Sequence, residues 1–162
     1  REKLIFNMKA VLAVGEYDNI WAGASNAYYD YNKETNTVKF TIESAGQMTE
    51  KKLLEKSCDV IITKLDIVLQ NIEKIINEEG LHDNQNVNIC LVNEDFTIGQ
   101  ILADILQQHN DVLFAAATKL NRLDNNINIK LETKKGVKPL NIFKTIVLST
   151  KELFSEFKKI IR

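Results

Sequence analysis

Apolar and polar residues alternate along four short stretches of the 162-residue chain, at 4–12, 38–42, 87–91 and 127–131. A period of two places successive side chains on opposite faces of an extended backbone, so each stretch predicts a half-buried β-strand. An uninterrupted apolar run also occurs at 112–117.

Apolar residues recur at spacings of three and four in three other segments, which predicts amphipathic helices near 50–78, 97–108 and 139–161. Thr49 is placed to cap the first long helix with its hydroxyl group, and Gly80 is placed to end it. The last helix opens on a proline, which the first helical turn tolerates because that position needs no N–H.

The segments between these elements define the expected organisation. Residues 15–36 are rich in Gly, Ala, Asn and Tyr and are expected to form an irregular connection. Turn-forming residues with little apolar content follow the first long helix, so we place a linker at 81–86. The linker separates a first module, 1–80, from a second module, 87–162.

The two modules match each other at an offset of 89 residues. Phe40-Thr41-Ile42-Glu43-Ser44 falls on Ile129-Lys130-Leu131-Glu132-Thr133. The apolar seams of the long helices also coincide, because Leu54, Cys58, Ile61, Leu65, Val68 and Ile72 fall on Phe143, Val147, Thr150, Phe154, Phe157 and Ile161. Any two amphipathic helices align at some offset, but here strand, turn and helix agree together, so we interpret the match as an internal duplication.

The predicted fold class is therefore α+β: two tandem sheet-plus-long-helix modules whose helices pack together as an intramolecular pseudo-dimer. The second module has a strand and a short helix, 87–108, that the first module lacks. Because the chain also begins at Arg1 and not at Met, we expect a fragment of a longer polypeptide. The missing strand is expected to leave a sheet edge unpaired, and the missing helix to uncover apolar side chains near Leu65 and Leu69.

Composition excludes several classes of protein. The formal net charge is −1, so no overall basic field draws the chain to nucleic acid or to a membrane surface. No apolar run approaches the roughly 20 residues of a membrane span, and no signal-peptide pattern opens the chain, so an intracellular location is expected. Cys58 and Cys90 each lie in an apolar periodic run and are expected to be buried free thiols.

The titratable residues form no recognisable catalytic or metal-binding constellation. His82 and His109 are not spaced with other ligand types as a zinc site requires. Glu94 and Asp95 are adjacent, which favours an electrostatic role at a helix start over an acid–base pair. The aromatic residues of 21–31 lack interleaved basic residues, which favours packing or protein contact over base stacking. We expect no catalytic residue, no metal and no cofactor.

A resemblance covers residues 87–162. The segment Glu94-Asp95-Phe96-Thr97-Ile98-Gly99-Gln100-Ile101-Leu102, followed by Asp111-Val112-Leu113-Phe114-Ala115-Ala116, resembles the smaller assembly subunit of cellular RNA polymerases, which is the L subunit in archaea, together with its eukaryotic equivalents. Lys138-Pro139-Leu140 before the last helix also suits that family. The chain departs from the family pattern at Phe96 for His, Ile98 for Leu, Gln100 for Asn and Ala116 for Gly, and the family's Pro-His-Pro turn is absent.

Residues 1–80 resemble, less specifically, the C-terminal part of the partner of that protein, which is the D subunit in archaea and the third-largest subunit in eukaryotes. Phe40-Thr41-Ile42-Glu43-Ser44-Ala45-Gly46-Gln47 is similar to that family's stretch before its long helix, and Gly15, Trp21 and Ala22 echo a preceding motif. The cysteine clusters of some relatives are absent. A single chain joining both partners resembles the fused arrangement of some large DNA viruses.

The resemblance implies a non-catalytic assembly subunit of a DNA-directed RNA polymerase, which acts as a dimerisation platform in transcription. Its implied partners are the large catalytic subunits and other small polymerase subunits, with no tight nucleic-acid binding, no membrane and no RNA synthesis by this chain alone. The location is then the nucleus, or the host-cell cytoplasm or virion for a virus. The residues expected to pack at the dimerisation interface are Leu54, Cys58, Ile61, Leu65, Val68, Ile72, Thr97, Gly99, Leu102, Phe114, Phe143, Val147, Phe154, Phe157 and Ile161.

An alternative stays open from the residues themselves. A small α/β enzyme or ligand-binding module, with a pocket between sheet and helices, has the same composition and periodicity. The enzyme requires a cleft with convergent titratable groups, whereas the scaffold requires exposed apolar and aromatic surface.

Overall fold

The computed structural model describes residues 3–15, 17–79, 84–119 and 125–161. In the first long helix, side chains are described as far as residue 76. Two compact units make up the chain, Arg1–Leu54 and Glu55–Arg162. Their boundary falls inside the first long helix and not in the predicted linker. The division of the chain into repeats at 1–80 and 87–162 stays a prediction.

The first unit contains an antiparallel hairpin of β1 (Ala24–Asn32) and β2 (Thr37–Ser44), preceded by a short 3-10 helix, η1 (Asn19–Trp21). The Asn32 side chain accepts hydrogen bonds from the backbone N–H groups of Glu34 and Thr35, which forms the turn. The strand predicted at 38–42 is confirmed.

Two predictions for the first unit are wrong. Residues 15–36 are not an irregular connection, because they contain β1, whose tyrosines favour an extended backbone and whose pairing with β2 depends on the turn. Residues 4–12 form no strand and their large apolar side chains are exposed. An alternating pattern yields a strand only where another strand pairs with it, and the described sheet here has two strands, β1 and β2.

The first long helix, α1 (Glu50–Glu79), confirms the segment predicted near 50–78. Thr49 caps it as expected, because its Oγ1 accepts a hydrogen bond from the backbone N–H of Lys52 at 3.4 Å. Gly80, the expected helix stop, lies outside the described residues.

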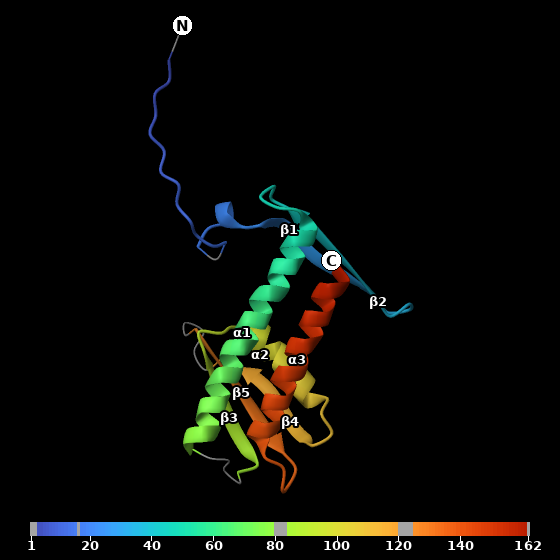
Figure 1. Ribbon diagram of the computed structural model, residues 1–162. Helices are drawn as coiled ribbons and strands as arrows, with labels where there is room; N and C mark the ends of the chain where they lie inside the picture. Colours follow the sequence, from blue (N-terminus) through green and yellow to red (C-terminus); the bar gives the residue numbers. More distant parts are fainter. Residues whose placement is uncertain (1–2, 16, 80–83, 120–124, 162) are drawn as a thin grey trace. The chain divides into compact units, whose positions relative to one another are not determined.

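The second unit contains a three-stranded antiparallel sheet in the order β3-β5-β4. Its other elements follow the predicted order: β3 (Asn86–Val92), α2 (Phe96–Gln107), β4 (Val112–Thr118), β5 (Asn126–Thr133) and α3 (Pro139–Ile161). Asn86, predicted as the last linker residue, is the first residue of β3 because it pairs with Glu132. The helices cover one face of the sheet (Figure 1).

Alternation along the strands explains which face is covered. In β5, Ile127, Ile129 and Leu131 are fully or almost fully buried, whereas Lys130 between them is exposed. β3 behaves in the same way, with Ile89 and Leu91 buried. The apolar face of this sheet and the helices above it form a single hydrophobic core.

Elements of the two predicted repeats correspond at the offset read from the sequence. β2 begins at residue 37 and β5 at residue 126, and α1 begins at residue 50 and α3 at residue 139, so both pairs differ by 89 positions. β1 and β4 also carry a register shift opposite the last two residues of their partner strands, between Ala24 and Asn26 in β1 and between Val112 and Phe114 in β4, so these positions differ by 88 while their partners differ by 89.

A hydrogen bond at the strand-to-helix turn repeats at the same offset. The Ser44 hydroxyl donates to the carbonyl oxygen of Met48 at 2.5 Å, and the Thr133 hydroxyl donates to that of Val137 at 3.1 Å. In each case the last strand residue fixes the carbonyl two residues before the helix begins. These shared hydrogen bonds support the duplication beyond the apolar seams.

Gly99 lies where α2 approaches β5 most closely. A Cβ atom added at Gly99 would lie 2.6 Å from Cδ1 and 3.0 Å from Cγ1 of Ile127. Ile127 is fully buried in the core, so its side chain has no open space into which to move. Glycine at this position therefore permits the close approach of α2 to β5.

Replacing Gly99 by Ala is expected to destabilise the protein, although alanine is the better helix former. The overlap with Ile127 should cost about 1–3 kcal/mol, and helix propensity returns about 1 kcal/mol. Urea unfolding should therefore show a net loss of up to roughly 2 kcal/mol for Gly99→Ala. Thr97→Ala, at an exposed position in the same helix, is the matched control and should change stability by less than about 0.5 kcal/mol. A raised stability for Gly99→Ala would contradict the tight contact.

Candidate assembly interface

Helix α1 contributes an apolar face to the core of the second unit. Its residues Leu65, Val68 and Ile72 belong to the same hydrophobic cluster as β5 and α3, and Cys58, about two turns before Leu65, is also buried. The cluster includes Phe143, Ile146 and Val147 of α3. The prediction that the two long helices share one core is therefore confirmed.

Helix α3 buries a different part of its apolar face. Phe143, Val147 and Thr150, in its first half, are at most 1% exposed. The face continues into the second half of the helix, but there Phe157 is 44% and Ile160 is 82% exposed. The last three turns of α3 therefore carry an apolar stripe that the described part of the chain leaves largely uncovered.

The two long helices bury different halves of their matching apolar seams. Leu65, Val68 and Ile72 of α1 correspond, at the offset of 89, to Phe154, Phe157 and Ile161 of α3. The α1 residues are buried, whereas Phe157 is exposed and the other two are partly exposed. The expectation of uncovered side chains near Leu65 and Leu69 is therefore wrong for this face. Leu65 is 1% exposed and Leu69 packs against the core, because the sheet and α3 cover this face of α1.

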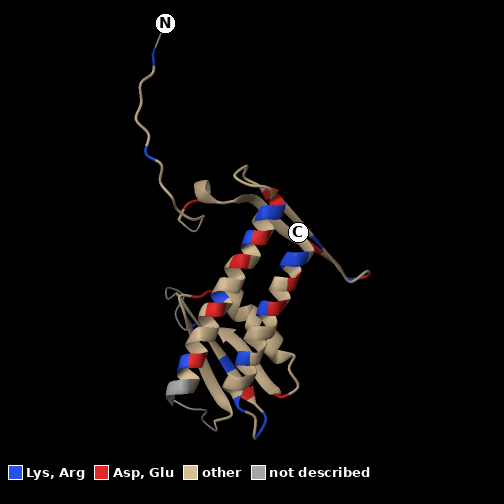
Figure 2. Ribbon diagram, viewed as in Figure 1, with Lys and Arg blue, Asp and Glu red and all other residues tan. Residues whose placement is uncertain are grey.

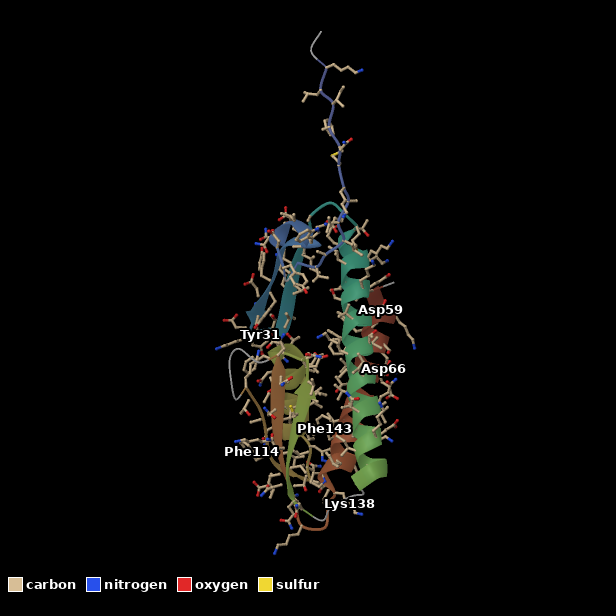
Figure 3. The ribbon with its side chains drawn as sticks, turned by 90° about the vertical axis from the view of Figure 1, so that its left-hand side faces the viewer. Tyr31, Asp59, Asp66, Phe114, Lys138 and Phe143 are labelled. Atoms are coloured by element: carbon tan, nitrogen blue, oxygen red, sulfur yellow. The ribbon has the colours of Figure 1, made fainter. Side chains whose placement is uncertain are left out.

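Three ion pairs join α1 to α3 in a regular ladder. Their partners are Asp59 with Lys158, Asp66 with Lys151 and Glu73 with Lys144. Successive rungs are seven residues apart on both helices, so the helices run antiparallel with their acidic and basic rows in register (Figure 2). Asp59 and Asp66 project from the same side of α1 (Figure 3). The spacing of seven was visible in the sequence but was not recognised there.

The acidic pair before α2 is used in two different ways. Glu94 is buried and its carboxylate binds the Lys64 ammonium of α1 at 2.7 Å. Asp95 caps α2, because its carboxylate accepts a hydrogen bond from the backbone N–H of Phe96 at 2.8 Å. This hydrogen bond, together with Lys119 at 3.4 Å, lowers the pKa of Asp95. The expected electrostatic role is confirmed for Asp95, while Glu94 links α1 to the second repeat.

The two cysteines differ, so the expectation of two buried thiols is half right. Cys58 is buried, and desolvation, followed by the nearby Asp59, raises the pKa of its thiol. Cys90 is exposed, because it alternates with the buried Ile89 and Leu91 and lies on the other face of β3.

The remaining candidate interface residues fall into three groups. Gly99 and Leu102 are buried in the core, and Leu54 and Ile61 are partly buried. Thr97 is exposed on α2. Phe114 is exposed on the sheet face opposite Phe143 (Figure 3), so it does not contribute to the helix-covered core.

Within the described ranges, no three His, Cys, Asp or Glu side chains lie close enough together to hold a metal ion. His82 lies outside these ranges, and the His109 Nδ1 accepts a hydrogen bond from the backbone N–H of Asp111. None of the helices described is both long enough and apolar enough to cross a membrane.

Taken together, the second unit is an α+β arrangement in which two long antiparallel helices cover one face of a three-stranded sheet. Residues 86–159 match the sequence profile described as the RNA polymerase Rpb3/Rpb11 dimerisation domain. This match confirms the resemblance of residues 87–162 to polymerase assembly subunits at the level of the shared Rpb3/Rpb11 dimerisation domain.

A curated protein of Acanthamoeba polyphaga mimivirus, named "Putative DNA directed RNA polymerase subunit R470", is 25% identical to the chain over 107 residues. The aligned part covers 66% of this chain and 29% of the viral protein. The chain thus spans less than a third of the length of this relative. The matching profile and the viral relative are both described as parts of RNA polymerases.

The ion-pair ladder leads to a test by charge reversal. Asp66→Lys should place two ammonium groups together and destabilise the protein, and adding Lys151→Asp should restore the attraction. Each partly exposed pair contributes only about 0.2–1 kcal/mol. The free energy of unfolding recovered by adding Lys151→Asp should therefore be of that size at low salt and shrink as salt rises. Equilibrium unfolding of the single and the double variant measures this recovery. Glu156→Lys, an exposed reversal on α3 outside the ladder, is the control and should show no recovery with Lys151→Asp.

Proposed function

We propose that this chain is a non-catalytic assembly subunit of a DNA-directed RNA polymerase, in which the two halves of a dimerisation platform are joined in one polypeptide. The observation that carries the proposal is the burial of α1, from the first repeat, in the core of the second repeat. In an isologous dimer each partner gives the same element to the other. Here the linker between the repeats makes that exchange intramolecular.

The uncovered half of α3 supports a second, pseudo-symmetric core in the complete protein. By the offset of 89, Phe157 and Ile161 should pack on the sheet of the first repeat as Val68 and Ile72 pack on that of the second. The first repeat lacks counterparts of β3 and α2 within the described residues. We infer that a longer polypeptide supplies this strand and short helix, and that β2 pairs with it.

The partners that follow from this function are the large catalytic subunits and other small subunits of the polymerase. The chain itself should hold no cofactor and bind nucleic acid weakly, since its net charge is −1. A nuclear location, or a viral one in the host cytoplasm or virion, follows from the same function. The enzyme alternative has less support, because the groove between β3 and α1 is lined mainly by uncharged residues and its Glu94 is already paired.

The proposal predicts what the complete protein should bind. Purified under native conditions through an affinity tag, it should carry the large polymerase subunits with it in stoichiometric amounts. Leu65→Asp, which buries a charge in the shared core, should abolish this association together with folding. Leu153→Asp, on the uncovered stripe of α3, should leave the core of residues 55–161 folded but reduce assembly.

Two results would contradict the function. One is a complete protein that is monodisperse and associates with no polymerase subunit in the cells that make it. The other is template-dependent RNA synthesis by the purified chain without any partner, since the proposed platform contributes no catalytic group.

A further inference from the structure

Strand β3 forms an edge of the sheet in the second unit. The order β3-β5-β4 leaves β3 paired on one side only among the described strands. An unpaired edge presents backbone N–H and C=O groups that can bind another strand. The two edges of this sheet differ in how far these groups are already satisfied.

The register shows which groups of β3 point outward. The Thr133 N–H donates to the carbonyl oxygen of Gln85 at 2.9 Å, so Gln85 and Thr133 form a hydrogen-bonded pair. In an antiparallel ladder every second residue repeats that pairing. The backbone groups of Asn88, Cys90 and Val92 therefore point away from β5, toward the open side.

The opposite edge, β4, is partly closed by a side chain. The Ala115 N–H donates to Oε1 of Gln107, the last residue of α2, at 2.8 Å. Proteins blunt exposed edges with such contacts, with charged residues or with proline. β3, with the sequence Asn-Val-Asn-Ile-Cys-Leu-Val, contains neither a charge nor a proline, and it has the composition of an aggregation-prone segment if it is left uncovered.

A groove runs along this open edge between β3 and α1, which lie side by side in Figure 1. Its volume is about 570 Å³, and its walls are the edge of β3 and the exposed side chains of Ile67 and Ile75. These two isoleucines are 50% and 38% exposed. They lie eight residues apart on one face of α1, so an extended segment in the groove would contact both.

The two charged side chains that line the groove differ in whether they are already paired. Glu94 is buried and already neutralised by Lys64 at 2.7 Å. Lys74 lines the groove near its other end and is exposed, and no ion pair joins it to an acidic side chain of described position. The groove therefore offers a row of backbone groups, an aliphatic wall and one cation.

We propose that this groove binds one extended strand of a polymerase partner polypeptide, which adds to the sheet at β3. Only a second peptide backbone can satisfy alternate N–H and C=O groups along a strand, and such strand addition is a common mode of peptide recognition. The strand carries aliphatic side chains toward Ile67 and Ile75 and a carboxylate at the end that reaches Lys74. The proposal rests on the proposed function, because it locates one contact of the assembled polymerase.

Cys90 reports directly on occupancy, because it lies in the middle of β3 and is exposed. In the complete protein alone, N-ethylmaleimide should modify Cys90 quickly. In the complex with the co-purified large subunits the rate should fall by about tenfold or more, since thiol reactivity follows access. Cys58, buried and with a raised pKa, should react slowly in both states and serves as the internal control.

A backbone variant separates strand addition from simple coverage. Asn88→Pro removes one outward N–H but spares the β3–β5 ladder, because proline is tolerated where an edge N–H faces away from the sheet. It should weaken assembly by about tenfold or more, whereas Asn88→Ala, which keeps the N–H, should assemble like the wild type. If circular dichroism shows that Asn88→Pro is unfolded, Ile67→Lys on the exposed groove wall tests whether the partner occupies the groove, with Ile67→Val as its control.

The outcomes distinguish this proposal from the proposed function. If the protein assembles with the large subunits but Cys90 stays reactive and both groove variants assemble normally, strand addition is wrong and the assembly function stands. Concentration-dependent protection of Cys90 in the protein alone would assign the groove to a second copy and overturn the partner assignment. Failure to bind any polymerase subunit would overturn both.

Discussion

The burial of one face of α1 is the interaction on which the rest of the structure depends. The sheet β3-β5-β4 is apolar on one face, and α2 and α3 alone leave the β3 side of that face open. Leu65, Val68 and Ile72 close it. Truncating one such side chain to alanine typically costs about 2–5 kcal/mol, a large part of the stability of a small domain. Helix α1, which precedes the predicted linker, thus completes the core of the sheet that follows it.

The polar contacts around this core determine geometry more than stability. Each rung of the Asp59–Lys158 ladder is partly exposed and contributes roughly 0.2–1 kcal/mol, well below one buried leucine. Three rungs with a common spacing nevertheless favour one antiparallel register over a shift by one turn, which would break them all. Gly99 acts similarly, because it sets how closely α2 approaches Ile127.

Elements with strong periodicity were predictable, because their pattern reflects the face that they bury. The long helices, β2, β3 and β5 follow the predicted segments, and the offset of 89 recurs in the structure. The strand predicted at residues 4–12 does not form, because an alternating pattern specifies a face but not a partner strand. β1 was missed because its pairing depends on the turn at Asn32 and on β2, not on its own apolar content.

The candidate interface was predictable in part for the same reason. The seam residues of α1 were read correctly, but which half of each seam is buried depends on elements distant in sequence, so the expectation of an uncovered Leu65 was wrong. Cys90 was assigned to the core because an apolar run does not show which of its two faces is covered. The spacing of seven residues between acids on α1 and between lysines on α3 is visible in the sequence, but it predicts ion pairs only if the two helices are known to pack antiparallel.

Separating the two repeats tests the central claim most directly. The chain would be cut between residues 80 and 86, outside the secondary structure described, by an inserted protease site. If α1 completes the second core, the two pieces should remain a 1:1 complex in size-exclusion chromatography and light scattering, and should separate when Leu65 is replaced by Asp. A second piece that leaves the first and stays folded as a monomer, with the unfolding midpoint of the intact chain, would contradict the account.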